Sequence, residues 1–154
     1  MTERERWMRL ALDLAREAAA AGETPVGCVI VKDGEIVGEG RNRREERKSA
    51  LSHAETEAIA AACARLGDWR LEGCALYVTL EPCPMCAGAI LNARIGELVY
   101  GAREEHTGCC GSVLDLFEEN FGWHPAVYGG VLAEESARLL ADFFTELRSG
   151  KKFQ

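Results

Sequence analysis

His53-Ala54-Glu55 and, further along the chain, Pro82-Cys83-Pro84-Met85-Cys86 are the two stretches that decide the fold and the chemistry of this sequence. One histidine and two cysteines supply three zinc-type ligands. Three protein ligands leave a fourth position for water, which is typical of catalytic rather than structural zinc sites. Glu55 is a carboxylate next to these ligands, and it could exchange protons with an activated water. The pattern therefore predicts hydrolytic chemistry at one Zn²⁺ per chain.

Both halves of this pattern fall at predicted helix starts. Ser52 is a typical N-cap, which predicts a helix over 52–66 with the histidine and the glutamate in its first turn. The first cysteine precedes a second helix, predicted over 84–93. Because helix N-termini favour negative charge, they favour the thiolate form that binds metal.

Each half also has a simpler interpretation. Ser52-x-x-Glu55 fits a capping box, in which the glutamate only satisfies a backbone N–H. Cys83-x-x-Cys86 after a strand fits a thioredoxin-type redox pair, so a thiol oxidoreductase is one alternative. Neither interpretation requires the other half of the pattern. The two halves together therefore favour a catalytic zinc site, with His53, Cys83 and Cys86 as metal ligands and Glu55 as the catalytic group.

The rest of the chain alternates between helical and strand patterns. Apolar residues recur at helical spacing over 4–21, and Asp33-Gly34 between two apolar runs indicates a β-hairpin. Strands alternating with helices after a hairpin predict an α/β fold, a three-layer α/β/α sandwich around a central mixed sheet of about five strands. The further predicted elements are strands at 74–80, 97–100 and 127–128, a short helix at 113–117 and a last helix at 134–148.

Length and composition predict one domain over 1–154. No apolar run approaches the roughly 20 residues needed to span a bilayer, and the N-terminus lacks a signal-peptide pattern. Seven cysteines without a secretory signal indicate the reducing cytoplasm, and no membrane partner is expected. The net charge of −7 argues weakly against nucleic acid, but residues 41–48 carry five positive and two negative charges. Such a run is usually solvated surface, and phosphate binding is the alternative.

Beyond the zinc motif, a signature already known for zinc deaminases, the chain resembles the bacterial tRNA-specific adenosine deaminases (TadA type) of the cytidine deaminase-like superfamily. The resemblance runs almost end to end. It rests on Pro25-Val-Gly27, Gly40-x-Asn42-Arg43, His53-Ala-Glu55, Leu76–Cys83, Met85-Cys-Ala-Gly88, Gly101-Ala-Arg103, Thr107-Gly108, Gly111-Ser112 and Asp142-Phe-Phe144.

The resemblance implies a cytidine deaminase-like fold and hydrolytic deamination of the wobble adenosine of a tRNA anticodon, giving inosine and ammonia. It implies a homodimer that binds a tRNA anticodon stem-loop. It also implies a set of substrate-binding residues: Val26, Asn42, Leu80, Arg103, Glu104 and Phe144. Within this set, the asparagine is expected to bind the nucleoside, the two aliphatic residues to wall the base, and the last three to form an RNA-facing rim.

Two segments depart from the family pattern. The family commonly has Asp-x-Lys after Gly-Ala-Arg, where this chain has Glu104-Glu105-His106. The family's Phe-Phe-Arg-x-Arg-Arg tail is here 143–148, with Arg148 as the one arginine left. Loss of basic contacts weakens phosphate binding. A small-molecule deaminase of the guanine or cytosine type is therefore an alternative with the same zinc chemistry. A non-catalytic RNA-binding subunit is a further alternative, which an intact Glu55 argues against.

Overall fold

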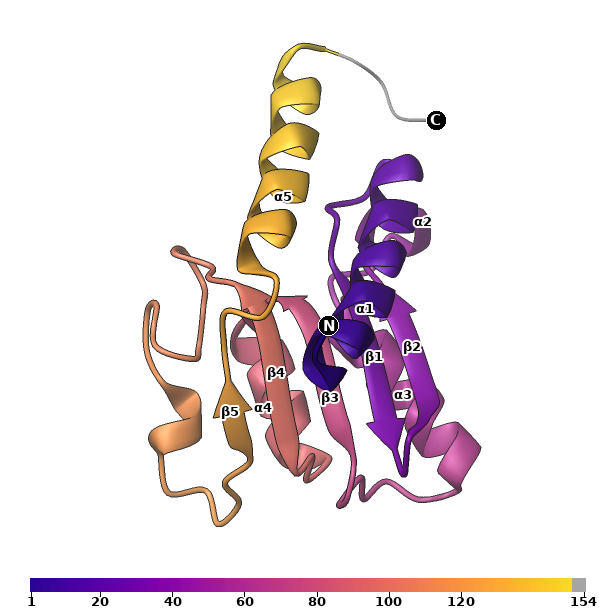
Figure 1. Cartoon of the computed structure of the whole chain (residues 1–154), viewed down its shortest axis with the longest axis vertical. Coiled ribbons are helices and arrows are strands. Elements are labelled where there is room, and N and C mark those ends of the chain that lie inside the picture. Colours follow the sequence, from indigo (N-terminus) through magenta and orange to yellow (C-terminus); the bar gives the residue numbers. More distant parts are fainter. Residues whose placement is uncertain (151–154) are drawn as a thin grey trace.

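A computed structural model describes residues 1–150, so the last four residues of the predicted domain lie outside it. Figure 1 shows a central sheet with helices on both faces. The elements are α1 (Glu3–Ala20), β1 (Gly27–Lys32), β2 (Glu35–Arg41), α2 (Arg44–Arg47), α3 (Ala54–Leu66), β3 (Ala75–Leu80), α4 (Pro84–Asn92), β4 (Glu97–Ala102), the 3₁₀ helix η1 (Leu116–Glu118), β5 (Ala126–Tyr128) and α5 (Ala133–Arg148).

The five strands lie in the order β2-β1-β3-β4-β5. β1 is antiparallel to both of its neighbours, whereas β3, β4 and β5 are parallel to one another. The sheet is therefore mixed, and β2, β3 and β4 all point their carboxyl ends to the same edge, the upper one in Figure 1. The predicted three-layer α/β/α sandwich with a mixed five-stranded sheet is confirmed.

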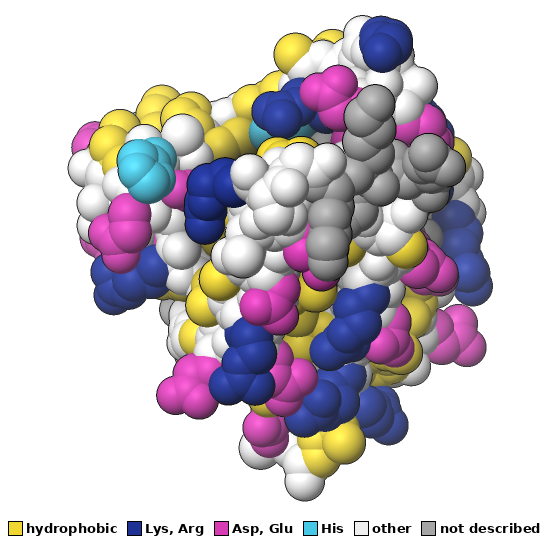
Figure 2. All heavy atoms as spheres, turned by 90° about the horizontal axis from the view of Figure 1, so that it is seen from above, with side chains coloured by type: hydrophobic (Ala, Val, Ile, Leu, Met, Phe, Trp, Pro, Cys, Tyr) yellow, Lys and Arg dark blue, Asp and Glu magenta, His cyan; other side chains and the backbone are white. Residues whose placement is uncertain are grey.

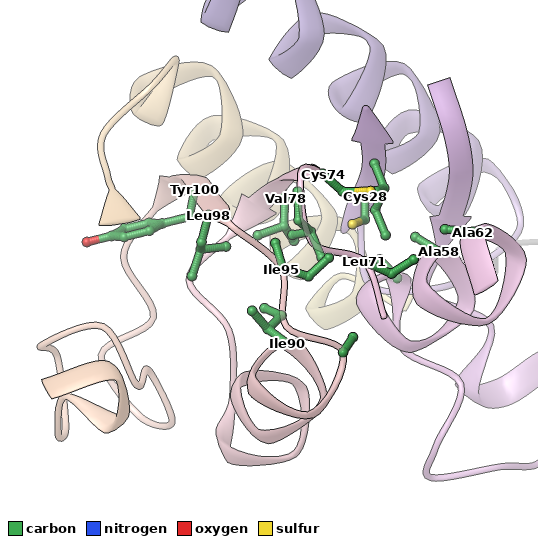
Figure 3. Packing of buried hydrophobic residues seen from close by; sticks show 14 of the residues in the cluster. Cys28, Ala58, Ala62, Leu71, Cys74, Val78, Ile90, Ile95, Leu98 and Tyr100 are labelled. Atoms are coloured by element: carbon green, nitrogen blue, oxygen red, sulfur yellow. The ribbon is translucent and has the colours of Figure 1, made fainter. Parts of the chain in front are cut away.

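Alternating strand residues build two separate cores. On β1, Cys28 and Ile30 join the core beneath α3 and α4, whereas Val29 and Val31 join the core beneath α1. The period of two along a strand places alternate side chains on opposite faces, so a sheet covered on both sides is apolar at every position. Figure 3 shows the first core, in which Leu71, Val78, Ile90 and Ile95 pack between the sheet and the helices.

Two backbone features that involve glycine explain how the strands and α3 are arranged. Asp33 and Gly34 both have positive φ, which is the geometry of a tight hairpin turn between β1 and β2. Gly40 lies against the backbone of α3, and a Cβ there would meet Ala58 N at 2.7 Å. This close approach brings the start of α3 to the edge at which β2 ends.

Three local details differ from the predictions. The helix predicted from Ser52 begins instead at Ala54. The short helix predicted at 113–117 is a 3₁₀ turn at Leu116–Glu118, because Asp115 accepts the backbone N–H of Phe117 and caps it there. The four-residue α2 was not predicted. Within residues 1–150, no helix is both long enough and apolar enough to cross a bilayer.

Candidate active site

Residues from two helix starts meet at the edge where β2, β3 and β4 end. His53 is the N-cap residue of α3, Cys83 is the N-cap residue of α4, and Cys86 lies in the first turn of α4. Pro84 occupies the first turn of α4, where a missing backbone N–H has no cost. In residues 1–150 these three side chains form the single cluster of His, Cys, Asp or Glu groups close enough to hold a metal ion.

The spacing of the three side chains fits zinc. His53 Nδ1 lies 3.7 Å from Cys83 Sγ and 3.5 Å from Cys86 Sγ. A tetrahedral ion with bonds of about 2.3 Å to sulfur and about 2.05 Å to nitrogen spaces such ligands about 3.6 Å apart. Two sulfurs and one imidazole nitrogen are also the donor types that zinc prefers. The cluster therefore suits one zinc ion with a fourth position left for water or substrate.

The protonation of the cluster is set by its internal hydrogen bonds. A hydrogen bond from the Cys86 thiol lowers the pKa of Cys83 to about 4, and the His53 ring adds to this shift. The same contact raises the pKa of Cys86, because that thiol is buried and serves as the donor. The hydrogen bond to Cys83 also raises the pKa of His53. Without metal, one proton is thus retained on Cys86, and a metal ion must displace it.

Glu55 lies beside the cluster in the first turn of α3 and is only 4% exposed. Burial raises the pKa of this carboxyl to about 7, against an opposing hydrogen bond from its own backbone. A general acid–base group works best with a pKa near the working pH, because it must both accept and release a proton. The position therefore suits proton transfer next to a metal.

The capping-box interpretation of Ser52 and Glu55 is wrong. Ser52 is not the N-cap, and the helix is capped at His53, whose backbone N–H donates to Thr56 Oγ1 at 3.1 Å. Thr56 is the third residue of α3 and performs the part assigned to the glutamate. Because Thr56 caps the helix, Glu55 is left for the pocket.

A cavity of about 170 Å³ opens beside the cluster. Of the residues expected to bind substrate, Val26, Asn42, Leu80 and Glu104 line it. Asn42 is nearly buried, and its Oδ1 accepts the backbone N–H of Arg44 at 3.1 Å. The side-chain NH₂ of Asn42 therefore remains available as a donor to a ligand.

Arg103 and Phe144 do not line the cavity. Arg103 is exposed directly after β4, and Phe144 is exposed on α5, which projects beyond this edge of the sheet (Figure 1). The Phe144 ring packs edge-on against Phe143, with ring centroids 5.4 Å apart. These two residues therefore lie outside the cavity itself.

Several residues at the cavity were not predicted from the sequence, namely Thr24, Ala54, Glu81 and Thr107. Arg44, from the basic run at 41–48, also lines the cavity. Glu81 had a local signal, since a carboxylate after a buried strand needs partners. It accepts the backbone N–H groups of Glu104, Cys110 and Ser112. Although burial raises the pKa of Glu81, these bonds and one from the Ser112 hydroxyl outweigh burial and hold it below its usual value.

Three of the five basic side chains in the run at 41–48 are ion-paired within the protein. Arg41 and Arg43 both pair with Glu46, at 3.0 and 2.7 Å, and Arg47 pairs with Glu57 at 3.1 Å. Within residues 1–150, Arg44 has no ion-pair partner, and it faces the cavity. Figure 2 looks onto this edge and shows basic and acidic side chains interspersed over the part that residues 1–150 occupy.

The remaining cysteines have structural surroundings. Cys28 and Cys74 are buried in the first core and are labelled in Figure 3. Cys63 is half-buried against the same core, with its thiol directed at the carbonyl of Trp69. Cys109 is buried and Cys110 half-buried, and neither joins a metal cluster in the described part of the chain.

Comparison with known proteins identifies this arrangement. Residues 1–102 match the family described as the cytidine and deoxycytidylate deaminase zinc-binding region. The chain belongs to this deaminase family. It is therefore a hydrolase with zinc as its cofactor, and His53, Cys83 and Cys86 fit that ion.

Comparison with individual relatives shows which members of the deaminase family this chain resembles more strongly. It is 46% identical to a tRNA-specific adenosine deaminase of Bacillus subtilis, over 99% of this chain and 95% of that one. It also matches the solved structure of a tRNA:A34 deaminase studied for A-to-I editing at the wobble position, with 44% identity and a TM-score of 0.84 over 88% of this chain and 99% of that one. A guanine deaminase from Bacillus subtilis is more distant, with 32% identity and a TM-score of 0.64 over the whole of both chains. The predicted resemblance to bacterial tRNA-specific adenosine deaminases is confirmed.

Proposed function

We propose that this deaminase hydrolyses the C6 amino group of the wobble adenosine in a tRNA anticodon, giving inosine and ammonia. The observation that carries the proposal is the near-complete match to a tRNA-specific adenosine deaminase, at 46% identity over 95% of its length. A match of this extent covers the pocket walls and the segment after β4 as well as the zinc motif.

The chemistry follows from four side chains. His53, Cys83 and Cys86 would hold zinc, which supplies the Lewis acidity that activates a water molecule. Glu55 takes a proton from that water and delivers it to the ring nitrogen next to C6. The water oxygen adds to C6, and the same carboxyl then moves the proton of the new C6 hydroxyl to the amino group. The C6–N bond breaks, ammonia leaves and C6 becomes a carbonyl. The pKa of about 7 suits Glu55 to both accepting and donating.

The cavity suits one base removed from the stack. Its volume of about 170 Å³ is smaller than the roughly 300–1,000 Å³ of pockets for drug-sized ligands. Val26 and Leu80 would wall the base, and the NH₂ group of Asn42 would donate to the nucleoside. Glu104 at the cavity and Arg103 outside it would contact the flanking nucleotides, and the exposed Phe144 ring would offer a stacking surface to the loop.

A direct competition of substrates tests the proposal. The zinc-loaded protein is assayed with an anticodon stem-loop that carries adenosine at the wobble position, and with free guanine, cytosine, adenosine and cytidine. We expect inosine in the stem-loop and little turnover of the free bases and nucleosides. Efficient deamination of guanine or cytosine with an unreacted stem-loop would refute the proposal.

The second candidate is a deaminase of a free base, of the guanine or cytosine type. The observation that favours it is electrostatic, because the chain carries a net charge of −7 and Arg41, Arg43 and Arg47 are all paired internally. A polyanionic substrate needs unpaired cations, whereas a neutral base does not. The substrate competition above separates the two candidates. Metal analysis separates both from a dithiol oxidoreductase, since a deaminase should contain about one zinc ion per chain.

We also propose that the protein is a cytoplasmic homodimer. Large apolar side chains are exposed in the segment after the Cys109-Cys110 turn, at Val113, Leu114 and Phe121, which is typical of a surface that pairs with another chain. The cytoplasm is where tRNA is found, and seven free thiols suit its reducing conditions. Sedimentation at micromolar concentration tests the dimer, and a monomeric mass would refute it.

A further inference from the structure

Glu81 is a buried carboxylate that holds the loop following β4. It is 3% exposed and lies between the end of β3 and the proposed zinc ligand Cys83. Its Oε1 accepts the Glu104 N–H at 3.0 Å and the Ser112 hydroxyl, and its Oε2 accepts the N–H groups of Cys110 at 2.8 Å and Ser112 at 3.1 Å. A single side chain thus ties both ends of the segment 104–112 to the strand that leads to the metal cluster.

Gly108 shows how tightly this segment closes over the carboxylate. A Cβ at this position would overlap the Glu81 carboxyl group and the Glu104 carbonyl oxygen. The backbone therefore approaches the acid as closely as glycine alone allows. Because the segment also carries Glu104 and Thr107 at the cavity, the Glu81 contacts fix where that wall of the cavity stands.

Glu23 does the same for the opposite loop. It is 2% exposed, precedes β1 and accepts the N–H of Glu45 at 3.0 Å and of Glu46 at 2.7 Å, one on each carboxyl oxygen. These two amides belong to the first turn of α2, whose own N-cap residue, Arg43, makes no side-chain capping bond. The turn is too short to persist alone, so it depends on this distant carboxylate.

The two loops stand on either side of the cavity. One follows β2 and places Asn42 and Arg44 at the cavity, and the other follows β4 and places Glu104 and Thr107 there. Hydrogen bonds to a buried carboxylate are stronger than those between neutral groups, so they suit segments with little apolar packing of their own. Neither carboxylate is among the three proposed metal ligands.

We propose that Glu23 and Glu81 are positioning residues that set the two substrate-facing loops at the distance required by the nucleic-acid substrate. The proposal rests on the proposed function and names the part of the protein that governs substrate binding rather than the chemical step. Loosening either loop should weaken binding of the stem-loop, while zinc and Glu55 continue to work on substrate that is bound.

The test compares Glu23→Gln and Glu81→Gln with the wild-type protein, all zinc-loaded. Glutamine has the size of glutamate, but its NH₂ group must face a backbone N–H in either orientation, because both carboxyl oxygens accept in both sites. Amide hydrogen exchange should quicken about tenfold over 43–48 in Glu23→Gln and over 104–112 in Glu81→Gln, with the core strands unchanged. KM for the stem-loop should rise about tenfold, with kcat within about twofold of wild type and zinc content unchanged.

Glu97→Gln is the matched control, because Glu97 starts β4 at the other edge of the sheet. Its carboxylate accepts a hydrogen bond only from the Arg4 side chain among residues 1–150. It should change neither loop exchange nor KM. If Glu81→Gln does not fold, Ser112→Ala removes one contact and leaves the three backbone donors in place; it should show the same effects in weaker form.

Wild-type exchange in both loops, or a loss confined to kcat or to zinc content, would overturn the proposal. These outcomes can be told apart from an error in the proposed function. If the proposed function is wrong, the wild-type protein will not deaminate the stem-loop, and the exchange measurements will still decide whether the two carboxylates hold the loops.

Discussion

Replacing Gly40 by alanine should damage the zinc site indirectly, by displacing α3, whose N-cap residue is the proposed zinc ligand His53. A Cβ at position 40 would stand 2.7 Å from Ala58 N and 2.9 Å from Glu57 Cβ, and it would also meet the Ala54 carbonyl oxygen. Ordinary contact begins at 3.4 Å, so α3 must move away from β2 by at least about 0.7 Å. These neighbours are helix backbone, which cannot rotate aside as a side chain can.

The shift should be felt at the metal cluster because His53 is the N-cap of α3, whereas Cys83 and Cys86 are carried by α4. Overpacking of this kind costs about 1–3 kcal/mol, which lowers the melting temperature of a domain of this size by roughly 2–12 °C. A misplacement approaching 1 Å lowers kcat by up to about 10²-fold. Zinc affinity should fall as well, because the 3.5 and 3.7 Å spacings are no longer met.

The measurements are zinc affinity by competition with a coloured chelator, the melting temperature and kcat on the preferred substrate. Gly96→Ala is the control, because a Cβ there meets nothing closer than 3.7 Å and the position lies just before β4, at the opposite edge of the sheet. If Gly40→Ala matches Gly96→Ala in all three measurements, the link between the β2–α3 contact and the metal site is refuted.

Four further predictions concern the site itself. Glu55→Gln should keep zinc, as measured by metal analysis, and lose at least about 10²-fold in kcat because the proton shuttle is gone; retained activity would remove Glu55 from the mechanism. Cys86→Ala should lose zinc and lower the melting temperature, since the ion ties two helix starts together; normal metal content would exclude it as a ligand. Zinc affinity in a pH titration should fall as the pH falls, because the pKa values of His53 and Cys86 are raised and both must lose protons to bind metal; a flat profile would contradict this. Arg44→Ala should weaken stem-loop binding and flatten its salt dependence more than Arg43→Ala, since Arg43 is already paired with a glutamate; equal effects would show that the ion pair does not matter.

The sequence predicts the elements whose signals are local. Short, nearly continuous apolar runs indicate β1 and β3, the Asp33-Gly34 pair indicates the hairpin, and the apolar period indicates α1. These patterns arise because side chains on one or both faces of each helix or strand are buried. Residues close together in the sequence are enough to show them. The spacing of the histidine and cysteine motifs also indicated which side chains meet, because each motif sits at the start of a predicted helix.

Features that depend on distant partners could not be predicted in this way. The α2 turn has no apolar period, and it exists because Glu23, far back in the chain, accepts two of its amides. In the sequence the positive run at 41–48 is a candidate phosphate-binding segment, but in the structure Glu46 and Glu57 form ion pairs with three of its five basic side chains. At the start of α3, the sequence fits a capping box formed by Ser52 and Glu55. The structure selects Thr56, which leaves Glu55 unengaged by the cap.

The ligand spacing along the chain has a consequence for the unfolded protein. His53 is 30 residues from Cys83 and 33 from Cys86, so a bound ion closes a loop of roughly thirty residues. In the chain-entropy treatment of cross-links, a loop of this length removes about 3.7 kcal/mol of unfolded-state freedom at 25 °C. The loop contains all of α3 and β3, which together supply much of the first core. The ion thus acts as a removable cross-link, and a chelator should make refolding slower as well as lowering stability, since the starts of α3 and α4 must then find each other unaided.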